Sequence, residues 1–181
     1  MAKQTMYVLE AVSLFVDNDD PTSSKYLTLT ELKLPTLEEN FADHSPGGAP
    51  VGIEIAVGIK KLEPTFKLVG FDPAMLAAFG LGSKAKRIFT GYGVIRDKKS
   101  GEPIEGKAII EGRIGKIEGD AFKRGDVQMH DYAINEVTHY EFHFDGKEVL
   151  YWDFWSNTWR VNGTDQFAAE NNILRIASTS V

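Results

Sequence analysis

The residues best suited to chemistry lie in the stretch Thr138–Val149, THYEFHFDGKEV. It places one glutamate between two histidines, in the spacing His139-x-Glu141-x-His143. Imidazole and carboxylate groups are common ligands of zinc and iron, so this spacing raises the hypothesis of a metal site. The stretch also alternates apolar and polar residues with period two and has no helical period, which predicts a β-strand.

The geometry of a β-strand argues against the metal. Asp145-Gly146 is a strong signal for a two-residue hairpin turn. The register that follows gives each nearby residue a partner across the hairpin: Phe144 with Lys147, Phe142 with Val149, Tyr140 with Tyr151, His143 with Glu148, Glu141 with Leu150 and His139 with Trp152. A strand rises about 3.4 Å per residue, so the Cα atoms of the two histidines would lie about 13 Å apart. We therefore expect a hairpin with a polar face, and neither a metal nor a cofactor.

No other residue pattern predicts catalysis. The chain has no cysteine, which excludes disulfides, thiolate metal ligands and cysteine nucleophiles. It also lacks the Gly-x-Ser-x-Gly motif of many hydrolases. Asp17–Pro21, DNDDP, begins like a calcium-binding loop, but a proline occupies the third ligand position and the required glycine and final glutamate are missing. The sequence therefore predicts a protein that is not an enzyme.

The composition is that of an ordinary globular protein. The 181 residues are 43% hydrophobic and 25% charged, which predicts a single domain over residues 1–181. Lys and Arg number 20 against 26 Asp and Glu, a net charge of −6, which argues against a protein that grips nucleic acid through its phosphates. A surface that nucleic acid passes without binding remains compatible with this charge. The chain shows no signal peptide or membrane-length apolar run, so we expect assembly in the cytoplasm.

Most of the chain has the alternating, β-branched and aromatic pattern of strands. The predicted strands are Met6–Val16, Tyr26–Leu34, Ile53–Ile59, Thr65–Phe71, Arg87–Arg96, Gly106–Ile117, Gln128–Phe144 and Glu148–Trp155. A short helix is predicted from Asp72 as N-cap, Pro73 at the first position and Gly80 as the stop. A weaker helical pattern covers Asp165–Ile173. The sequence therefore predicts a mainly β (α+β) fold with one flanking short helix.

The stretch Glu38–Gly52, EENFADHSPGGAPVG, differs from the rest. It contains two prolines and three glycines and has little periodicity, which predicts a surface loop. A loop of this length is uncommon inside a compact domain and is often functional.

Four stretches share their order and spacing with motifs of a known family. They are Leu29–Phe41 (LTELKLPTLEENF), Ser45–Ile55 (SPGGAPVGIEI), Gly119–Asp126 (GDAFKRGD) and Tyr140–Phe167 (YEFHFDGKEVLYWDFWSNTWRVNGTDQF). The first holds a Leu-Pro-x-Leu segment, and the last an Asp-Gly-Lys-Glu hairpin followed by Val-Asn-Gly-x-Asp. Over about residues 6–174 the chain resembles the major tail tube proteins of contractile-tailed bacteriophages, a P2-like family also found in R-type bacteriocins. Asp17–Tyr26 and the C-terminal tail, residues 175–181, do not match the family pattern.

This resemblance implies a β-sandwich or barrel-like subunit that assembles into hexameric rings. Stacked rings would form the inner tube of a virion tail, through which the genome leaves. The implied partners are further copies of the chain, the tail sheath protein, the baseplate or initiator proteins and the tape measure protein. The subunit itself would not insert into a membrane, and DNA would pass through the lumen without specific binding.

The resemblance also suggests two sets of functional residues. The loop over residues 38–52 would order on assembly and form a subunit interface through Asn40, Phe41, Ser45, Pro46, Gly47, Gly48 and Pro50. Acidic residues on strand faces outside the core would line the lumen and repel phosphates, with Glu111, Asp131 and Glu141 as candidates.

Three alternatives remain open at this point. The chain could be the tube subunit of a bacteriocin or another contractile injection system that carries no DNA. It could be a β-barrel metal-dependent enzyme or ligand-binding protein that uses the histidine and glutamate face. It could also be a tail terminator or neck protein, which would form rings but not tubes.

Overall fold

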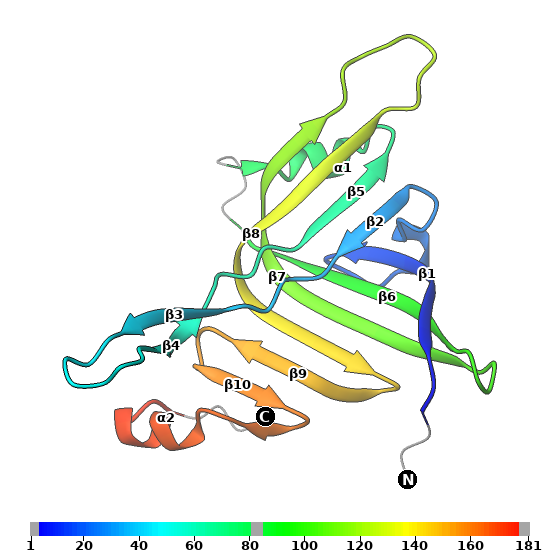
Figure 1. Ribbon diagram of the computed structural model, residues 1–181. Helices are drawn as coiled ribbons and strands as arrows, with labels where there is room; N and C mark the ends of the chain where they lie inside the picture. The colour runs from blue at the N-terminus through cyan, green and yellow to red at the C-terminus, as the bar shows by residue number, and fades with distance from the viewer. Residues whose placement is uncertain (1–3, 81–84, 178–181) are drawn as a thin grey trace.

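The chain folds around one large antiparallel β-sheet (Figure 1). The computed structural model describes residues 4–80 and 85–177. The strands are β1 (Tyr7–Val16), β2 (Leu29–Lys33), β3 (Glu39–His44), β4 (Ile53–Ile59), β5 (Thr65–Val69), β6 (Arg87–Asp97), β7 (Pro103–Gly119), β8 (Met129–Phe144), β9 (Lys147–Asp153), β10 (Thr158–Val161) and β11 (Thr164–Asp165). The main path of paired strands is β1-β6-β7-β8-β9-β10-β11, and β5 joins β2 to β8. β3 and β4 form a separate two-stranded sheet.

The helices are short and lie outside this sheet. They are a 3₁₀ turn, η1 (Pro21–Ser23), and the helices α1 (Pro73–Ala77) and α2 (Ala168–Leu174). The prediction of a mainly β fold is confirmed. Each of the eight predicted strands corresponds to an observed one, with ends that differ by a few residues, but β3, β10 and β11 were not predicted. Within the described ranges, no helix has the length and apolarity needed to cross a membrane.

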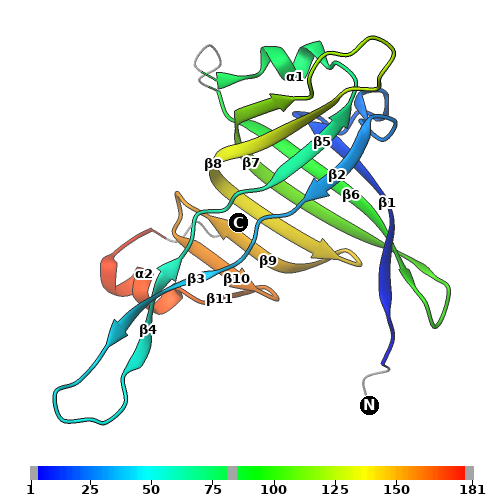
Figure 2. The ribbon, with the colours of Figure 1, turned by 45° about the horizontal axis from the view of Figure 1, so that its top comes forward.

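Two long strands allow the sheet to fold over itself. β7 and β8 are 17 and 16 residues long, and their pairing shifts register between Glu111 and Arg113 and again between Ile114 and Lys116. Glu136 lies in this region with a φ of 48°, the left-handed backbone typical of an irregularity in a strand. Beyond the shifts, β8 leaves its pairing with β9 and pairs with β5 instead (Figure 2). The two halves of one sheet thus become two layers.

The core lies between these layers. Phe66 of β5 is 2% exposed, and its ring stacks on Tyr132 of β8 at 4.8 Å with an interplanar angle of 3°. Phe89 of β6, which is fully buried, approaches Phe66 from the other layer at 5.9 Å. Leu14 and Ile110 complete the centre of the core from β1 and β7. The predicted alternation of the strands therefore places their apolar sides in one shared interior.

The predicted start of α1 is confirmed. Asp72 caps the helix, since its Oδ1 accepts hydrogen bonds from the backbone N–H groups of Ala74 and Met75, both at 3.1 Å, and Pro73 occupies the first turn. The helix ends at Ala77, earlier than the predicted stop at Gly80.

α2 is held to the β9–β10 turn by two asparagines. Asn171 is 3% exposed; its Oδ1 accepts from Asn157 Nδ2 at 2.7 Å, and its Nδ2 donates to the backbone carbonyl of Asn157 at 2.9 Å. Ile173 and Leu174, by contrast, remain 81% and 64% exposed. The docking of α2 therefore depends more on this polar clasp than on apolar burial.

Replacing Asn171 with alanine is expected to release α2. The change removes both hydrogen bonds of the buried Asn171 side chain, each of which contributes about 0.5–1.5 kcal/mol. Hydrogen exchange of residues 168–174 should accelerate while the strands keep their protection. Asn172→Ala, at an exposed neighbouring position, is the control and should leave the exchange of α2 nearly unchanged. Equal exchange in the two variants would contradict the role of the clasp.

Candidate functional site

A two-stranded hairpin, here called the arm (Glu39–Ile59), is exposed over its whole length. It comprises β3, β4 and the turn between them, and it projects away from the body of the subunit (Figures 1 and 2). The prediction of a loop over Glu38–Gly52 is therefore wrong for residues 39–44, which form β3 and pair with β4. β3 lacks the alternation of a half-buried strand because neither of its faces is buried. Residues 45–52 do form the connecting turn.

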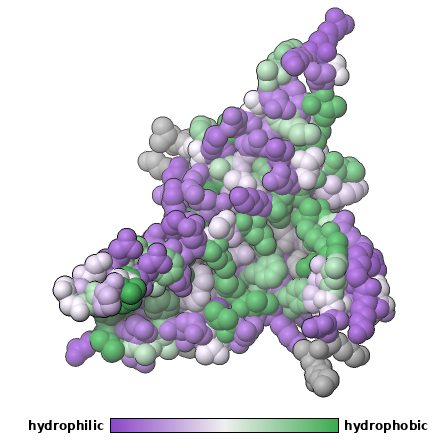
Figure 3. Space-filling model, viewed as in Figure 1, coloured by the Kyte–Doolittle hydropathy of each residue, from purple (hydrophilic) through white to green (hydrophobic). Residues whose placement is uncertain are grey.

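The arm presents apolar side chains to solvent. Every residue of β3 and β4 is exposed. Five large apolar residues of the arm's strands are 39–64% exposed, namely Phe41 54%, Ile53 59%, Ile55 46%, Val57 64% and Ile59 39%. Hydrophobic side chains reach the surface along the arm in the space-filling view (Figure 3). A lone two-stranded hairpin is marginally stable in water, and clustered exposed apolar residues typically mark an interaction surface.

The predicted interface residues all lie on the arm and are all exposed. Asn40 and Phe41 belong to β3, where they pair with Gly58 and Ala56 of β4. The others lie in the turn: Ser45, Pro46, Gly47, Gly48 and Pro50. The structure thus brings the seven residues onto one projecting element, and their contact with another subunit stays a prediction.

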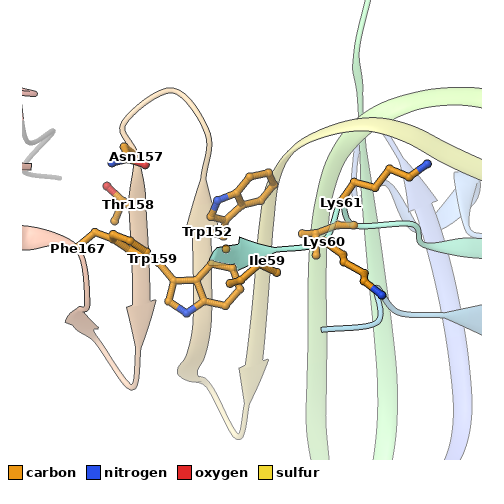
Figure 4. Close-up of a pocket in the computed structure, with 10 residues that line it drawn as sticks. Ile59, Lys60, Lys61, Trp152, Asn157, Thr158, Trp159 and Phe167 are labelled. Carbon is orange, nitrogen blue, oxygen red and sulfur yellow. The ribbon is translucent and has the colours of Figure 1, made fainter. Parts of the chain in front are cut away.

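A small cavity opens at the base of the arm (Figure 4). It has a volume of about 250 Å³, and its apolar lining is Ile59, Leu62, Trp152, Trp159 and Phe167. Trp152 and Trp159 are paired on β9 and β10, while the side chains of Lys60 and Lys61 point away from the two indoles. The lining contains neither a carboxylate nor a histidine. The cavity can therefore accept an apolar side chain but is not arranged for acid–base chemistry.

The histidines and Glu141 lie on the side of the sheet opposite the core. They form part of a connected group, here called the polar cluster: His139, Glu141, His143, Glu148, Tyr151, Asp153 and Arg160. Glu141 stands between the two histidines. Its Oε1 lies 2.8 Å from His139 Nε2, and its Oε2 lies 2.7 Å from His143 Nε2.

The predicted hairpin register is correct only near the turn. Asp145-Gly146 forms the turn, and the pairs Phe144–Lys147 and His143–Glu148 are confirmed. A register shift between Phe142 and His143 then moves every later pair by one residue. The observed pairs are Phe142 with Leu150, Glu141 with Tyr151, Tyr140 with Trp152 and His139 with Asp153. An extra residue on β9 at this irregularity causes the shift, and the hairpin pattern contains no signal for it.

This arrangement differs from the one expected for the histidines. The sequence predicted only neighbours on the facing strand, of which Glu148 opposite His143 is confirmed, but both histidines also bind a carboxylate on their own strand. Among the residues that the structure describes, no group of three or more His, Asp or Glu side chains is placed to hold a metal ion. The cluster is therefore an ion-pair and hydrogen-bond network.

The network shifts the protonation of its members. Hydrogen bonding to His139, reinforced by His143, lowers the pKa of Glu141 to about 2 although partial burial opposes the shift. Burial favours the neutral form of His139, but the hydrogen bonds and charges of Glu141 and Asp153 outweigh it and raise the pKa of this ring. Glu141 is therefore ionised at every ordinary pH, and His139 holds its proton more readily than a free histidine.

Replacing Glu141 with glutamine should change how stability depends on pH. With a folded pKa of about 2 against an ordinary 4.5, Glu141 stabilises the fold by about 3 kcal/mol above pH 4.5 and loses this as the pH falls toward 2. The same contact raises the pKa of His139, so this stabilisation is full below the ordinary 6.5 of histidine and is lost as the pH rises through the raised value. We expect the variant to lose most stability between these limits and little near pH 2.

Urea denaturation across this pH range measures the effect. Glu54→Gln removes the same charge from an exposed position on the arm and serves as the control. A constant difference between Glu141→Gln and the unaltered chain from pH 2 to pH 6 would contradict the linkage.

The structure separates the three acidic residues predicted to line a lumen. Glu111 pairs with His139 across β7 and β8, and its carboxylate accepts a hydrogen bond from Thr138 Oγ1 at 3.0 Å. Glu141 belongs to the polar cluster on the same stretch of these strands. Asp131 lies beyond the register shifts, where it pairs with Lys67 at 3.1 Å. The structure brings Glu111 and Glu141 together but not Asp131, and a role for any of them in a lumen stays a prediction.

Sequence reasoning missed the strongest ion pair of the cluster. Arg160 of β10 donates through Nε and Nη2 to the two oxygens of Glu148, at 3.0 and 2.7 Å, and its guanidinium lies 3.5 Å from the centre of the Tyr151 ring. A signal for β10 was available, because Asn162-Gly163 is a hairpin dipeptide and both residues adopt positive φ. The same residues begin Asn162-Gly163-Thr164, which matches a glycosylation acceptor, but that match does not predict a strand.

A comparison with known protein families gives a match over most of the chain. The family model described as "Phage tail tube protein FII" matches residues 7–174. No curated protein matches the chain significantly. Among solved structures, the chain is similar to one from the extended sheath–tube complex of the extracellular contractile injection system PVC, with 9% identity, a TM-score of 0.49 and coverage of 70% of this chain and 86% of that one.

A second similar structure comes from the baseplate of the anti-feeding prophage, AFP, with 11% identity, a TM-score of 0.44 and coverage of 79% of this chain and 95% of that one. The family model extends from the first residue of β1 to the last residue of α2. The chain therefore belongs to the Phage tail tube protein FII family.

Proposed function

We propose that six copies of this chain close into a ring and that the rings stack into the inner tube of a contractile tail. As a member of its family, the chain is a tail tube subunit of a phage or a related contractile injection system, and it is not an enzyme. The observation that carries the proposal of assembly is the arm, whose apolar side chains have no cover within the subunit. A neighbouring copy would cover the arm, and the seven exposed residues from Asn40 to Pro50 would lie in that contact.

The edges of the sheet support closure into a ring. The main strand path ends at β1 on one side and at β11 on the other. β1 is ten residues long, and a free edge of this length invites pairing with another chain. Pairing between copies would remove both edges and continue the sheet around a channel.

The side of the sheet opposite the core would then face the channel. It carries Glu111 and Glu141, whose charges would repel the phosphates of DNA that passes through the lumen. Asp131, paired with Lys67 in the other half of the sheet, is the weaker of the three candidates. DNA would pass without specific binding, and the chain would need no cofactor.

We further propose that the whole chain, residues 1–181, acts as one tail tube domain in the virion tail after assembly in the host cytoplasm. Its partners would be the tail sheath protein around the tube, the baseplate or initiator proteins at its end and the tape measure protein. The C-terminal tail, residues 175–181, would contact a neighbouring ring or the sheath; its last four residues lie outside the described ranges. A bacteriocin or injection tube without DNA is the alternative, because such a tube would share the subunit design.

Negative-stain electron microscopy of the purified protein over a range of concentrations tests this proposal. We expect rings or long hollow tubes, formed directly or after addition of baseplate or initiator proteins. Particles that stay monomeric in the presence of those proteins would overturn it. Rings that never stack would instead favour a terminator or neck protein.

A further inference from the structure

We propose that Glu148 and Glu141 mask cationic groups of the polar cluster, so that the donors they occupy are not available to a phosphodiester polyanion. This inference rests on the proposed function in one respect, that the cluster faces the channel. It differs from general acidity, because the two glutamates would act by occupying particular nitrogen atoms. The ligand class that masking excludes is any chain of phosphodiesters.

Arg160 is the member of the cluster best suited to bind a phosphate. A guanidinium offers a planar fork of donors that fits phosphate oxygens, and it is the side chain proteins prefer for that contact. Here the Nε–Nη2 side of this fork is engaged, because the two nitrogens donate to the two oxygens of Glu148 at 3.0 and 2.7 Å. The face of the guanidinium lies on Tyr151 at 3.5 Å from the ring centre. The Nε–Nη2 edge and one face of the guanidinium are thus occupied within the subunit.

The histidines are masked in the same way. Each oxygen of Glu141 lies within 2.8 Å of one histidine Nε2, so a single carboxylate serves two rings. The second nitrogen of His139, Nδ1, lies 3.4 Å from Asp153. When His139 carries its proton, the charge is already opposed by two carboxylates. In Arg160, His139 and His143, nitrogen atoms that could donate to a phosphate therefore contact carboxylate oxygens instead.

Glu111 provides an internal comparison. It carries the same charge and lies across from His139, but it accepts a hydrogen bond from the hydroxyl of Thr138, and Lys86 donates to that hydroxyl at 3.0 Å and not to Glu111 itself. Repulsion by net charge alone predicts that the loss of Glu111 and the loss of Glu148 favour polyanion binding equally. Masking predicts that only the loss of Glu148 creates a new donor.

Fluorescence anisotropy with a labelled oligothymidine of about 20 nucleotides, near neutral pH and at about 50 mM salt, separates the two accounts. We expect purified Glu148→Gln to bind about tenfold more tightly than the unaltered chain, with a steep loss of binding on addition of salt. Glu111→Gln should stay within about twofold of the unaltered chain. The double variant Glu148→Gln with Arg160→Gln should return to the unaltered level, because the freed guanidinium is gone.

Glu148→Asp keeps the charge but shortens the side chain, so it provides a second test that does not depend on net charge. Masking predicts that it also binds the oligonucleotide more tightly, because the paired contact with Arg160 requires the full reach of glutamate. Thermal denaturation checks that each variant is folded. Equal binding by Glu111→Gln and Glu148→Gln, or folded Glu148 variants that bind no better than the unaltered chain, would overturn the proposal.

The outcome for masking is separable from the outcome for the tube. Tubes seen by electron microscopy together with no gain of binding in the Glu148 variants would remove the masking alone. A gain of binding in subunits that never assemble would support masking as a property of this surface and would remove its placement in a channel.

Discussion

Replacing Ile55 with aspartate is expected to abolish tube formation without unfolding the subunit. Ile55 lies in the middle of β4, opposite Ala42 of β3, and its side chain is 46% exposed in the subunit. An interface that covers the part still exposed gains about half of what full burial of an isoleucine contributes, which is about 1 kcal/mol for each contact. A carboxylate at this position would instead be desolvated without a partner, and each contact between copies would pay that cost again. Assembly repeats the contact many times, so the effect on a polymer is large.

The subunit itself should tolerate the change. Exposed positions outside special backbone sites usually alter stability by less than about 0.5 kcal/mol, so the midpoint of thermal unfolding should move by no more than about 2 °C. Sedimentation and electron microscopy then measure the amount of polymer. Ile55→Val is the matched control, because it keeps an apolar branched side chain, and it should still form tubes. Normal tubes from the aspartate variant would exclude the middle of the arm from the subunit interface.

The elements that could be predicted are those whose local chemistry matches their final environment. The β8–β9 turn follows from Asp145-Gly146, and both residues adopt the positive φ that this turn requires. The start of α1 follows from Asp72 and Pro73, since the cap and the fixed φ of proline act within one turn of helix. The core strands follow from period-two alternation because one of their faces is buried in the subunit.

The elements that could not be predicted depend on contacts outside the local sequence. β3 has no buried face in the subunit, so it lacks the pattern by which strands are recognised. The shift between Phe142 and His143 depends on which backbone groups β9 offers to β8, and it moved Glu141 from Leu150 to Tyr151. Arg160 was missed because its short strand follows a tight turn, although its pairing with Glu148 ties β10 to β9. The candidate site was thus found in part, through its histidines and Glu141, and its cationic half was not.

Replacing Phe66 with alanine is expected to destabilise the core strongly. Phe66 is 2% exposed and stacks on Tyr132, with Phe89 at its other side. Removal of a buried phenylalanine ring costs about 3–5 kcal/mol, because the surroundings close the resulting cavity only in part. For a chain of this size the midpoint of thermal unfolding should fall by about 10 °C or more. Phe122→Ala, at a position 82% exposed, is the matched control and should melt close to the unaltered chain.

The same substitution should impair assembly at temperatures where the subunit is still folded. The arm leaves the body after β2, which ends at Lys33, and returns to it before β5, which begins at Thr65. β2 and β5 pair with each other, so the layer that Phe66 holds against β6 also carries both ends of the arm. A loosened layer would leave the arm without a fixed direction, and ordering it on assembly would cost additional conformational entropy. We therefore expect polymer yield to fall on warming before the far-ultraviolet circular dichroism signal changes. Loss of both signals together would mean that the Phe66 stack supports the fold but does not orient the arm.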